Sequence, residues 1–175
     1  MNIEFLVATM HQTDCHFLEQ MNIKSNAVVI NQCEQTTQEI IHQQDQQIKF
    51  LSYKEIGLSR SRNRALDAAT GDICVIADDD VIYNDDCNAK ILKAYETYPD
   101  ADLIAFQIIR TGNTRLKTFR SQPSVENWLS CMKISSVEIT FKRESILKKG
   151  IRFNTLFGAG AYFNNGEENI FLFDC

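Results

Sequence analysis

The sequence feature that most constrains the fold is an apolar run that ends in three consecutive acids. Residues 72–77 read DICVIA, and Asp78, Asp79 and Asp80 follow directly. A run this apolar is typical of a strand buried on both faces, as in the parallel sheet of an α/β protein. Neighbouring carboxylates repel one another unless a cation neutralises them, and oxygen ligands suit Mg²⁺ or Mn²⁺. The run therefore predicts either a metal site at a strand end or an acidic turn before the next helix.

The segment before this strand predicts an amphipathic helix over residues 59–70. Ser59 is a candidate N-cap, and Gly71 is the stop signal after the helix. Arg62 lies on the apolar face, whereas Arg60 and Arg64 are expected to face solvent. All three arginines are near the acids in sequence, and spacing alone does not decide which of them reaches the site. The apolar face also contains Leu58, Ala65, Leu66 and Ala69.

The rest of the chain alternates between strand-like and helix-like segments, which predicts an α/β fold with a mainly parallel sheet. Further strands are expected at residues 3–9, 27–30, 48–52, 103–109 and 137–141. Further helices are expected at residues 84–98 and 143–149, and a loop at residues 151–165. The glutamine-rich stretch 38–47 predicts a helix or its exit loop.

The most basic stretch lies between the predicted strands at 103–109 and 137–141. Residues 111–120 predict a loop or hairpin, which is either a solvated edge or a contact to phosphate or a membrane surface. Its cations, with the residue just before it, are Arg110, Arg115, Lys117 and Arg120.

Composition narrows the class of protein. The chain has 175 residues, of which 44% are hydrophobic and 23% charged, so one domain with a substantial core is expected. A net charge of −5 argues against a broad nucleic-acid surface. Six cysteines without a C-x-x-C pair favour reduced core thiols. The sequence shows no secretory signal and no apolar run of the roughly 20 residues that a bilayer needs, so association with a membrane would be peripheral.

Three predicted strands end in polar side chains that are suited to a ligand. Thr9, Asn31 and the acids from Asp78 to Asp80 follow strands 3–9, 27–30 and 72–77. Ligands of α/β sheets bind at the carboxyl ends of the strands, so these residues are expected to converge. A metal on Asp80, with Asp78 at a ribose hydroxyl, would hold a nucleoside diphosphate. The glycines near residue 160 do not continue into a dinucleotide fingerprint, and no Walker loop, G-x-S-x-G elbow or zinc spacing is present.

Two long blocks carry a family resemblance. GLSRSRNRALDAATGDICVIADDDV and SSVEITFKRESILKKGIRFNTLFGAGAYFNNGEENIFL together resemble the family 2 glycosyltransferases with the GT-A fold, particularly bacterial enzymes of capsular or exopolysaccharide assembly. The resemblance covers nearly the whole chain and implies a GT-A-like three-layer α/β/α sandwich with a mainly parallel central sheet as one domain, residues 1–175. About 1–110 would bind the nucleotide sugar, and about 111–175 would form an acceptor and catalytic half that is expected to be incomplete.

The resemblance also implies roles for individual residues. Asp78 and Asp80 correspond to the D-x-D acids that bind ribose and the divalent metal, with Asp79 between them. Glu168 would be the general base, with Glu167 as second choice, where the family usually has Glu-Asp. The nucleotide side would further include Thr9, Arg62 and Asn31. Asn31 stands where many relatives have an acid that contacts the base, and its amide either reads the base edge or is structural.

The function that the resemblance implies is inverting, metal-dependent sugar transfer. The donor would be a nucleotide sugar, most simply a UDP-sugar, with Mn²⁺ or Mg²⁺ as cofactor. The acceptor would be a saccharide or a lipid-linked saccharide of a cell-surface polysaccharide, at the inner face of the membrane in the cytoplasm. Two alternatives are a truncated domain that binds donor and metal but transfers little, and a nucleotidyltransferase or phosphatase that uses the same acids. The latter would leave Glu167 and Glu168 without a purpose.

Overall fold

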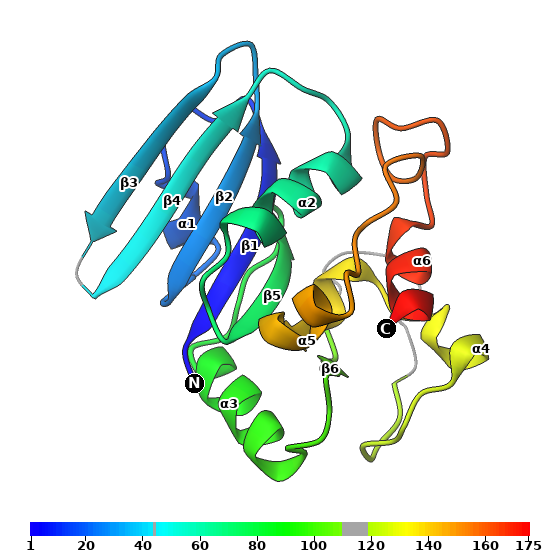
Figure 1. The fold of residues 1–175 in the computed structure, drawn as a ribbon. Helices are drawn as coiled ribbons and strands as arrows, with labels where there is room; N and C mark the ends of the chain where they lie inside the picture. Colours follow the sequence, from blue (N-terminus) through cyan, green and yellow to red (C-terminus); the bar gives the residue numbers. More distant parts are fainter. Residues whose placement is uncertain (44, 110–118) are drawn as a thin grey trace.

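The fold is built on one seven-stranded sheet with the order β3-β4-β2-β1-β5-β7-β6 (Figure 1). The computed structural model describes residues 1–43, 45–109 and 119–175. The strands are β1 (Ile3–Met10), β2 (Asn26–Gln32), β3 (Thr37–Gln43), β4 (Gln46–Tyr53), β5 (Ile73–Asp78), β6 (Leu103–Ala105) and β7 (Ile139–Lys142).

Helices cover both faces of this sheet. They are α1 (Phe17–Gln20), α2 (Leu58–Ala68), α3 (Cys87–Thr97), α4 (Trp128–Cys131), α5 (Arg143–Lys148) and α6 (Glu167–Asp174), with a 3-10 turn at Ser136–Glu138. Alternate residues of β1 enter two separate cores: Phe5 and Val7 pack with α1 and α3, whereas Leu6 packs with α2, α5 and α6. The predicted three-layer α/β/α architecture is therefore confirmed.

The sheet is parallel at its centre and antiparallel at its margins. β4, β2, β1 and β5 run parallel, whereas β3 pairs antiparallel with β4, and β7 pairs antiparallel with both β5 and β6. The parallel strands are buried on both faces, which explains their nearly continuous apolar sequences. The prediction of a mainly parallel central sheet is confirmed.

Two predicted elements were wrong in ways that long-range pairing explains. Residues 38–47 were expected to be helix or loop, but Thr37–Gln43 form the edge strand β3 against β4. An exposed edge strand tolerates polar side chains on both faces, so its sequence lacks the usual alternation. The strand expected at 103–109 ends at Ala105, because its partner β7 begins only at Ile139 and offers three paired positions.

Helix ends also differ from the sequence-based prediction. The N-cap of α2 is Gly57, and Ser59, the expected cap, instead lies inside the first turn. The basic stretch 111–120 falls almost entirely outside the described residues. Its last cation, Arg120, lies 3.3 Å from Glu126 in an exposed ion pair. In the part of the chain that the structure describes, no helix is long and apolar enough to cross a membrane.

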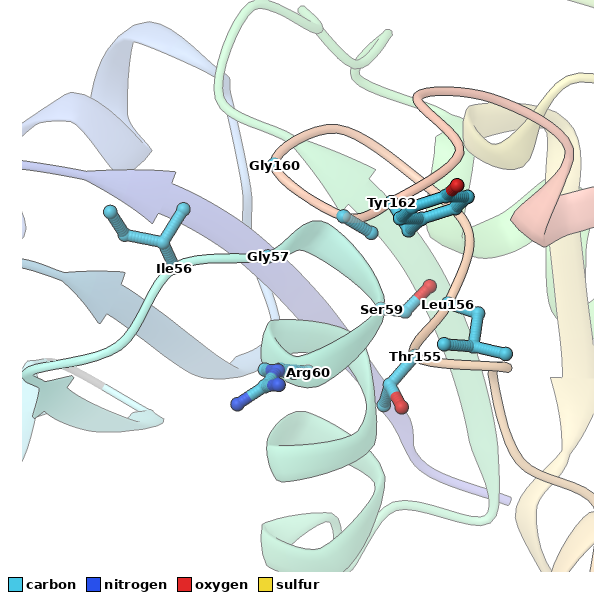
Figure 2. A pocket seen from close by; sticks show the side chains of 9 residues that line it. Ile56, Gly57, Ser59, Arg60, Thr155, Leu156, Gly160 and Tyr162 are labelled. Carbon is cyan, nitrogen blue, oxygen red and sulfur yellow. The ribbon is translucent and has the colours of Figure 1, made fainter.

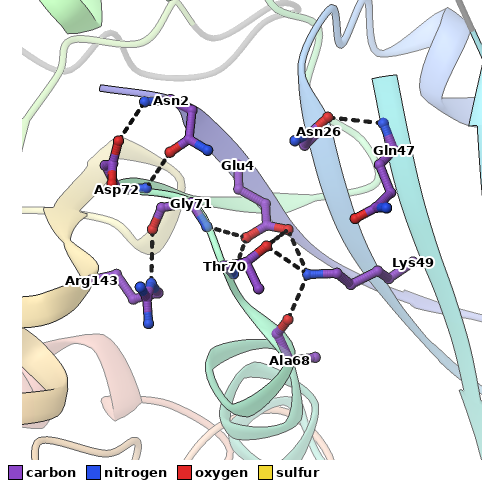
Figure 3. A network of polar contacts seen from close by, with 10 residues as sticks. All are labelled: Asn2, Glu4, Asn26, Gln47, Lys49, Ala68, Thr70, Gly71, Asp72 and Arg143. Carbon is purple, nitrogen blue, oxygen red and sulfur yellow. Dashed lines mark hydrogen bonds and ion pairs between the residues drawn. The ribbon is translucent and has the colours of Figure 1, made fainter. Parts of the chain in front are cut away.

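A buried polar network fixes the amino ends of β1 and β5 (Figure 3). Glu4 of β1 is 1% exposed, and its carboxylate accepts hydrogen bonds from the backbone amides of Thr70 and Gly71 in the turn between α2 and β5. Lys49 Nζ of β4 lies 3.1 Å from the same carboxylate. Buried carboxylates are stable only when paired and hydrogen-bonded in this way. The network therefore sets where β5, and the acids at its far end, lie in the sheet.

We predict that Gly71→Ala lowers the free energy of unfolding by about 1–3 kcal/mol, the usual cost of overpacking a core. A Cβ at Gly71 would come within 2.5 Å of Glu4 Cβ, an atom that the β1 backbone holds in place. Chemical denaturation measures the loss. Gly150→Ala is a control, because nothing lies within 4 Å of its Cβ position and only the positive φ of +68° opposes the change. An unchanged denaturation midpoint in Gly71→Ala would contradict the steric explanation.

Candidate functional site

The carboxyl ends of β1, β2 and β5 meet at one edge of the sheet. Thr9 is paired with Asn31, and Ala8 with Asp78, in the parallel register. The predicted convergence of these strand ends is confirmed. The hydroxyl of Thr9 donates a hydrogen bond to Asp79 Oδ2 at 2.5 Å, which ties the end of β5 to that of β1.

The three aspartates occupy different surroundings. Asp78, the last residue of β5, is half-buried and accepts a hydrogen bond from Arg62. Asp79 is engaged by Thr9. Asp80 is exposed, and its carboxylate has no hydrogen bond or ion pair with any residue that the structure describes. Asp80 is therefore the acid that is left most accessible to a ligand.

The carboxylate oxygens at the carboxyl ends of these strands suit a hard cation that takes its remaining ligands from substrate phosphates or water. Within residues 1–43, 45–109 and 119–175, no group of three or more His, Cys, Asp or Glu side chains converges as a metal cage. Mg²⁺ is usually held by one or two carboxylates together with substrate phosphates and water, so Asp78 and Asp80 fit that mode of binding.

Two amides at the end of β2 organise the backbone around the site. The side chain of Asn31 is buried; it accepts a hydrogen bond from the amide of Gln12 and donates to the carbonyl of Gln12 and to Ser52. The neighbouring Gln32 donates to the carbonyl of Gly57 and accepts from its amide. These contacts favour the structural role of Asn31, and they show that Gln32 holds the start of α2.

The position of Arg62 is the central geometric feature of the site. Its side chain is 1% exposed, with Nη2 donating to Asp78 Oδ1 at 3.0 Å and Nη1 donating to Glu167 Oε1 at 2.9 Å. One guanidinium therefore joins the acid at the end of β5 to the first residue of α6. As predicted, Arg60 and Arg64 lie on the solvent side of α2.

The loop at residues 154–165 is tied to the first turn of α2. The amide of Leu58 donates to the carbonyl of Ala159, and the hydroxyl of Ser59 donates to the carbonyl of Phe157. Gly158 has a φ of +101°, and a Cβ there would lie 3.2 Å from the carboxyl carbon of Glu167. The loop thus passes directly over the acidic start of α6, and only glycine fits at its closest point.

Glu167 and Glu168 are distinguished by their partners. Glu167 is buried and paired with Arg62. Glu168 is half-buried, and its pKa is raised, first by burial and then by the neighbouring charge of Glu167, while Arg62 acts in the opposite direction. A raised pKa makes a carboxylate a stronger proton acceptor at neutral pH, so Glu168 is the better placed of the two for general-base chemistry.

A pocket of about 320 Å³ adjoins this loop (Figure 2). It lies between the start of α2 and the loop, and the exposed ring of Tyr162 forms part of its wall. Arg60 also lines it and has no ion pair with a described residue. The lining residues are Ile56, Gly57, Ser59, Arg60, Thr155, Leu156, Gly160, Ala161 and Tyr162.

Sequence reasoning missed several residues that build the site. Ser59, Asn63 and Gln32 each hold backbone of a distant segment: Asn63 exchanges two hydrogen bonds with the backbone of Phe153, at 2.8 and 2.9 Å. The hydrogen bonds of Ser59 and Asn63 join residues that are 98 and 90 positions apart in the sequence. Ser59 and Asn63 are polar residues of a predicted helix and Gln32 follows a predicted strand, and neither signal identifies the partner.

Comparison with family models places the chain in a known enzyme family. The model of glycosyl transferase family 2 matches residues 11–164, and the chain belongs to that family. A search of curated proteins found no significant match.

Solved structures of S. aureus TarS share the fold. The structure of TarS 1-349 superposes with a TM-score of 0.69 at 14% identity, over 99% of this chain and 55% of that one. TarS 1-349 in complex with UDP-GlcNAc gives 0.65 at 14% identity, over 88% and 49%, and its complex with UDP gives 0.69 at 15%, over 98% and 54%. The chain therefore spans about half the length of these proteins. The likeness confirms the predicted GT-A-like fold.

We predict that Glu168→Gln raises the melting temperature at neutral pH. Because the folded-state pKa of Glu168 is above its ordinary value, ionisation costs the folded state stability once the pH exceeds that raised pKa. Below the ordinary value, about 4, both states are protonated and the variant should match the wild type. Thermal unfolding across pH measures this.

Glu144→Gln is the matched control, because Glu144 also lies in the first turn of a helix but is exposed. Both substitutions lose the favourable interaction of an acid with the helix dipole. The difference between their melting temperatures therefore reports the burial of Glu168 and its repulsion by Glu167. A lower melting temperature for Glu168→Gln than for Glu144→Gln at neutral pH would contradict the account.

Proposed function

We propose that this chain is the donor-binding and catalytic part of a metal-dependent inverting glycosyltransferase that uses a UDP-sugar. The observation that carries the proposal is the placement of Asp78 and Glu167 on one guanidinium, which puts the D-x-D acids and the acidic motif of α6 at a common site. Family membership supports sugar transfer. The UDP and UDP-GlcNAc complexes of TarS, a protein of the same fold, support a uridine nucleotide as donor.

The donor would lie at the carboxyl ends of β1, β2 and β5. Thr9 and Asp79 form a hydrogen-bonded rim there, and Asp78 would contact the ribose while the exposed Asp80 would lie on the side of the diphosphate. Mn²⁺ or Mg²⁺ bound by Asp80 and Asp78 would supply charge neutralisation for the departing diphosphate. Asn31 would shape this site through the loop at Gln12.

Glu168 would act on the acceptor. Its carboxylate takes the proton from a sugar hydroxyl as that oxygen attacks the anomeric carbon, and attack opposite the leaving diphosphate inverts the anomeric centre. Its raised pKa suits this role. Glu167, whose carboxylate is already paired with Arg62, is the second candidate.

The acceptor side would be formed by residues 111–175, and the nucleotide side by about 1–110. The pocket beside Tyr162 supports this division, because its loop passes over Glu167 at Gly158. An aromatic ring with a neighbouring cation suits a saccharide that carries a negative charge. Assembly of a capsular or other cell-surface polysaccharide on a saccharide or lipid-linked acceptor, in the cytoplasm at the inner face of the membrane, is the proposed setting.

A binding-only function is the second candidate. The chain covers 55% of TarS 1-349. In that case the protein would bind donor and metal, yet transfer or hydrolyse little. Turnover of a UDP-sugar separates the two candidates, because both require donor binding and only one requires Glu168.

We predict that UDP with Mn²⁺ raises the melting temperature by about 5–10 °C at 100 times its Kd, from a stabilisation of about 2.7 kcal/mol. Asp80→Asn should abolish the Mn²⁺-dependent part of this shift, because the exposed acid would no longer hold the metal. Asp100→Asn, an exposed acid elsewhere, is the control. Persistence of the metal-dependent shift in Asp80→Asn would exclude Asp80 as a ligand, and no shift in the wild type would refute donor binding.

We predict that Glu168→Gln lowers kcat for transfer or donor hydrolysis roughly 10²- to 10⁴-fold, the usual contribution of a general base. Calorimetric affinity for UDP should remain close to that of the wild type. Glu144→Gln again serves as the control for loss of a first-turn acid. If turnover is unchanged in Glu168→Gln and falls in Glu167→Gln, the roles of the two acids are reversed.

A further inference from the structure

Arg62 has no exposed face from which to contact a nucleotide. Its side chain is 1% exposed, and both terminal nitrogens are used by carboxylates. We propose that Arg62 is a positioning residue. Its two charge-assisted hydrogen bonds hold Asp78, an acid of the proposed nucleotide-sugar site, at a fixed distance from Glu167, the neighbour of the proposed base Glu168. The catalytic consequences of this inference rest on the proposed function. The two ion pairs of Arg62 with Asp78 and Glu167, called the bridge below, can be tested without any ligand.

The chemistry of the bridge requires arginine. A planar guanidinium presents several donors in a fixed fork, so it can hold two carboxylates in defined directions at once. A lysine ammonium is a point charge on a flexible stem, and it would approach one acid at the expense of the other. Removing the cation would leave two buried or half-buried carboxylates without their counter-charge, which is strongly unfavourable.

An aromatic frame holds the guanidinium in place. Arg62 Cζ lies 5.5 Å from the ring centroid of Phe153, which stacks on Phe171 of α6 at 4.3 Å and an interplanar angle of 5°. The adjacent Asn63 fixes the backbone of Phe153 by two hydrogen bonds. Arg62 of α2 therefore fixes α6 through its ion pair with Glu167. The neighbouring Asn63 fixes α6 through Phe153, whose ring packs on Phe171.

One nitrogen of Arg62, Nε, is buried and has no hydrogen-bond partner among the described residues. A buried donor without a partner is costly, so the orientation of the guanidinium follows the two acids at the expense of its own complete hydrogen bonding.

The catalytic consequence follows from the start of α6. Glu167 is the first residue of that helix and Glu168 the second, so a shift of Glu167 also displaces the proposed base. Displacement of a reacting group by about 1 Å can cost on the order of 100-fold in rate. Loss of the bridge is therefore expected to reduce turnover more than donor affinity.

The direct test is a double-mutant cycle in stability between Asp78→Asn and Glu167→Gln, measured by chemical denaturation. Each single variant leaves Arg62 one acid, whereas the double variant leaves a buried cation with none. The drop in denaturation midpoint should therefore exceed the sum of the two single drops. Asp78→Asn combined with Glu55→Gln is the control, because Glu55 pairs with Arg64 on the same helix. Additive effects in the first cycle would overturn the bridge.

The catalytic part is tested with Arg62→Lys against Arg64→Lys. In Arg62→Lys, calorimetry should show UDP binding at wild-type stoichiometry, while kcat falls at least about tenfold more than UDP affinity. Arg64→Lys should change neither quantity. A fall in kcat that merely follows a reduced stoichiometry would mean a structural role and would overturn the positioning role. Coupling in the stability cycle without UDP binding by the wild type would retain the bridge and refute the proposed function.

Discussion

The arrangement of this site depends on one buried cation between two acids. Arg62 lies on α2, Asp78 at the end of β5 and Glu167 at the start of α6, so their contacts join three elements from both halves of the chain. Burial of a guanidinium is favourable only when its charge is matched, and burial of each acid only when it is paired. Arg62 and Glu167 are therefore stable in their buried positions only as partners in these ion pairs, which the partly exposed Asp78 completes. The fold and the site are therefore coupled by the same ion pairs.

The buried carboxylate of Glu4 shows how a purely structural network differs. At the opposite end of β1, both carboxylate oxygens of Glu4 accept hydrogen bonds, from Lys49 Nζ and from backbone amides at Thr70 and Gly71. That carboxylate has no capacity left for a ligand. At the other edge of the sheet, Asp78 Oδ2 has no partner among the described residues, and Asp80 is exposed. The candidate site therefore differs from the structural network around Glu4, because some of its carboxylate oxygens have no partner among the described residues.

Local patterns predicted the parts of the structure that local forces determine. The buried strand before Asp78, the amphipathic helix that carries Arg62, and the meeting of strand ends follow from apolar periodicity and the rules of parallel sheets. The strand at Thr37–Gln43 could not be read from its glutamines, because only pairing with β4 makes it a strand. Likewise, Ser59 has the sequence signal of a cap, yet its hydroxyl bonds a carbonyl 98 positions away. Roles that depend on a distant partner are not encoded in a local pattern.

Arg62 holds Asp78 and Glu167 together, and we expect both acids to lie beside a single bound nucleotide sugar. A crystal structure of the protein with UDP and Mn²⁺ tests this most directly. We expect the diphosphate at the carboxyl ends of β1, β2 and β5, beside Asp78 and Asp80, with Arg62 still bonded to Asp78 and Glu167. A nucleotide bound elsewhere, or an Arg62 released from either acid to contact the diphosphate, would contradict it.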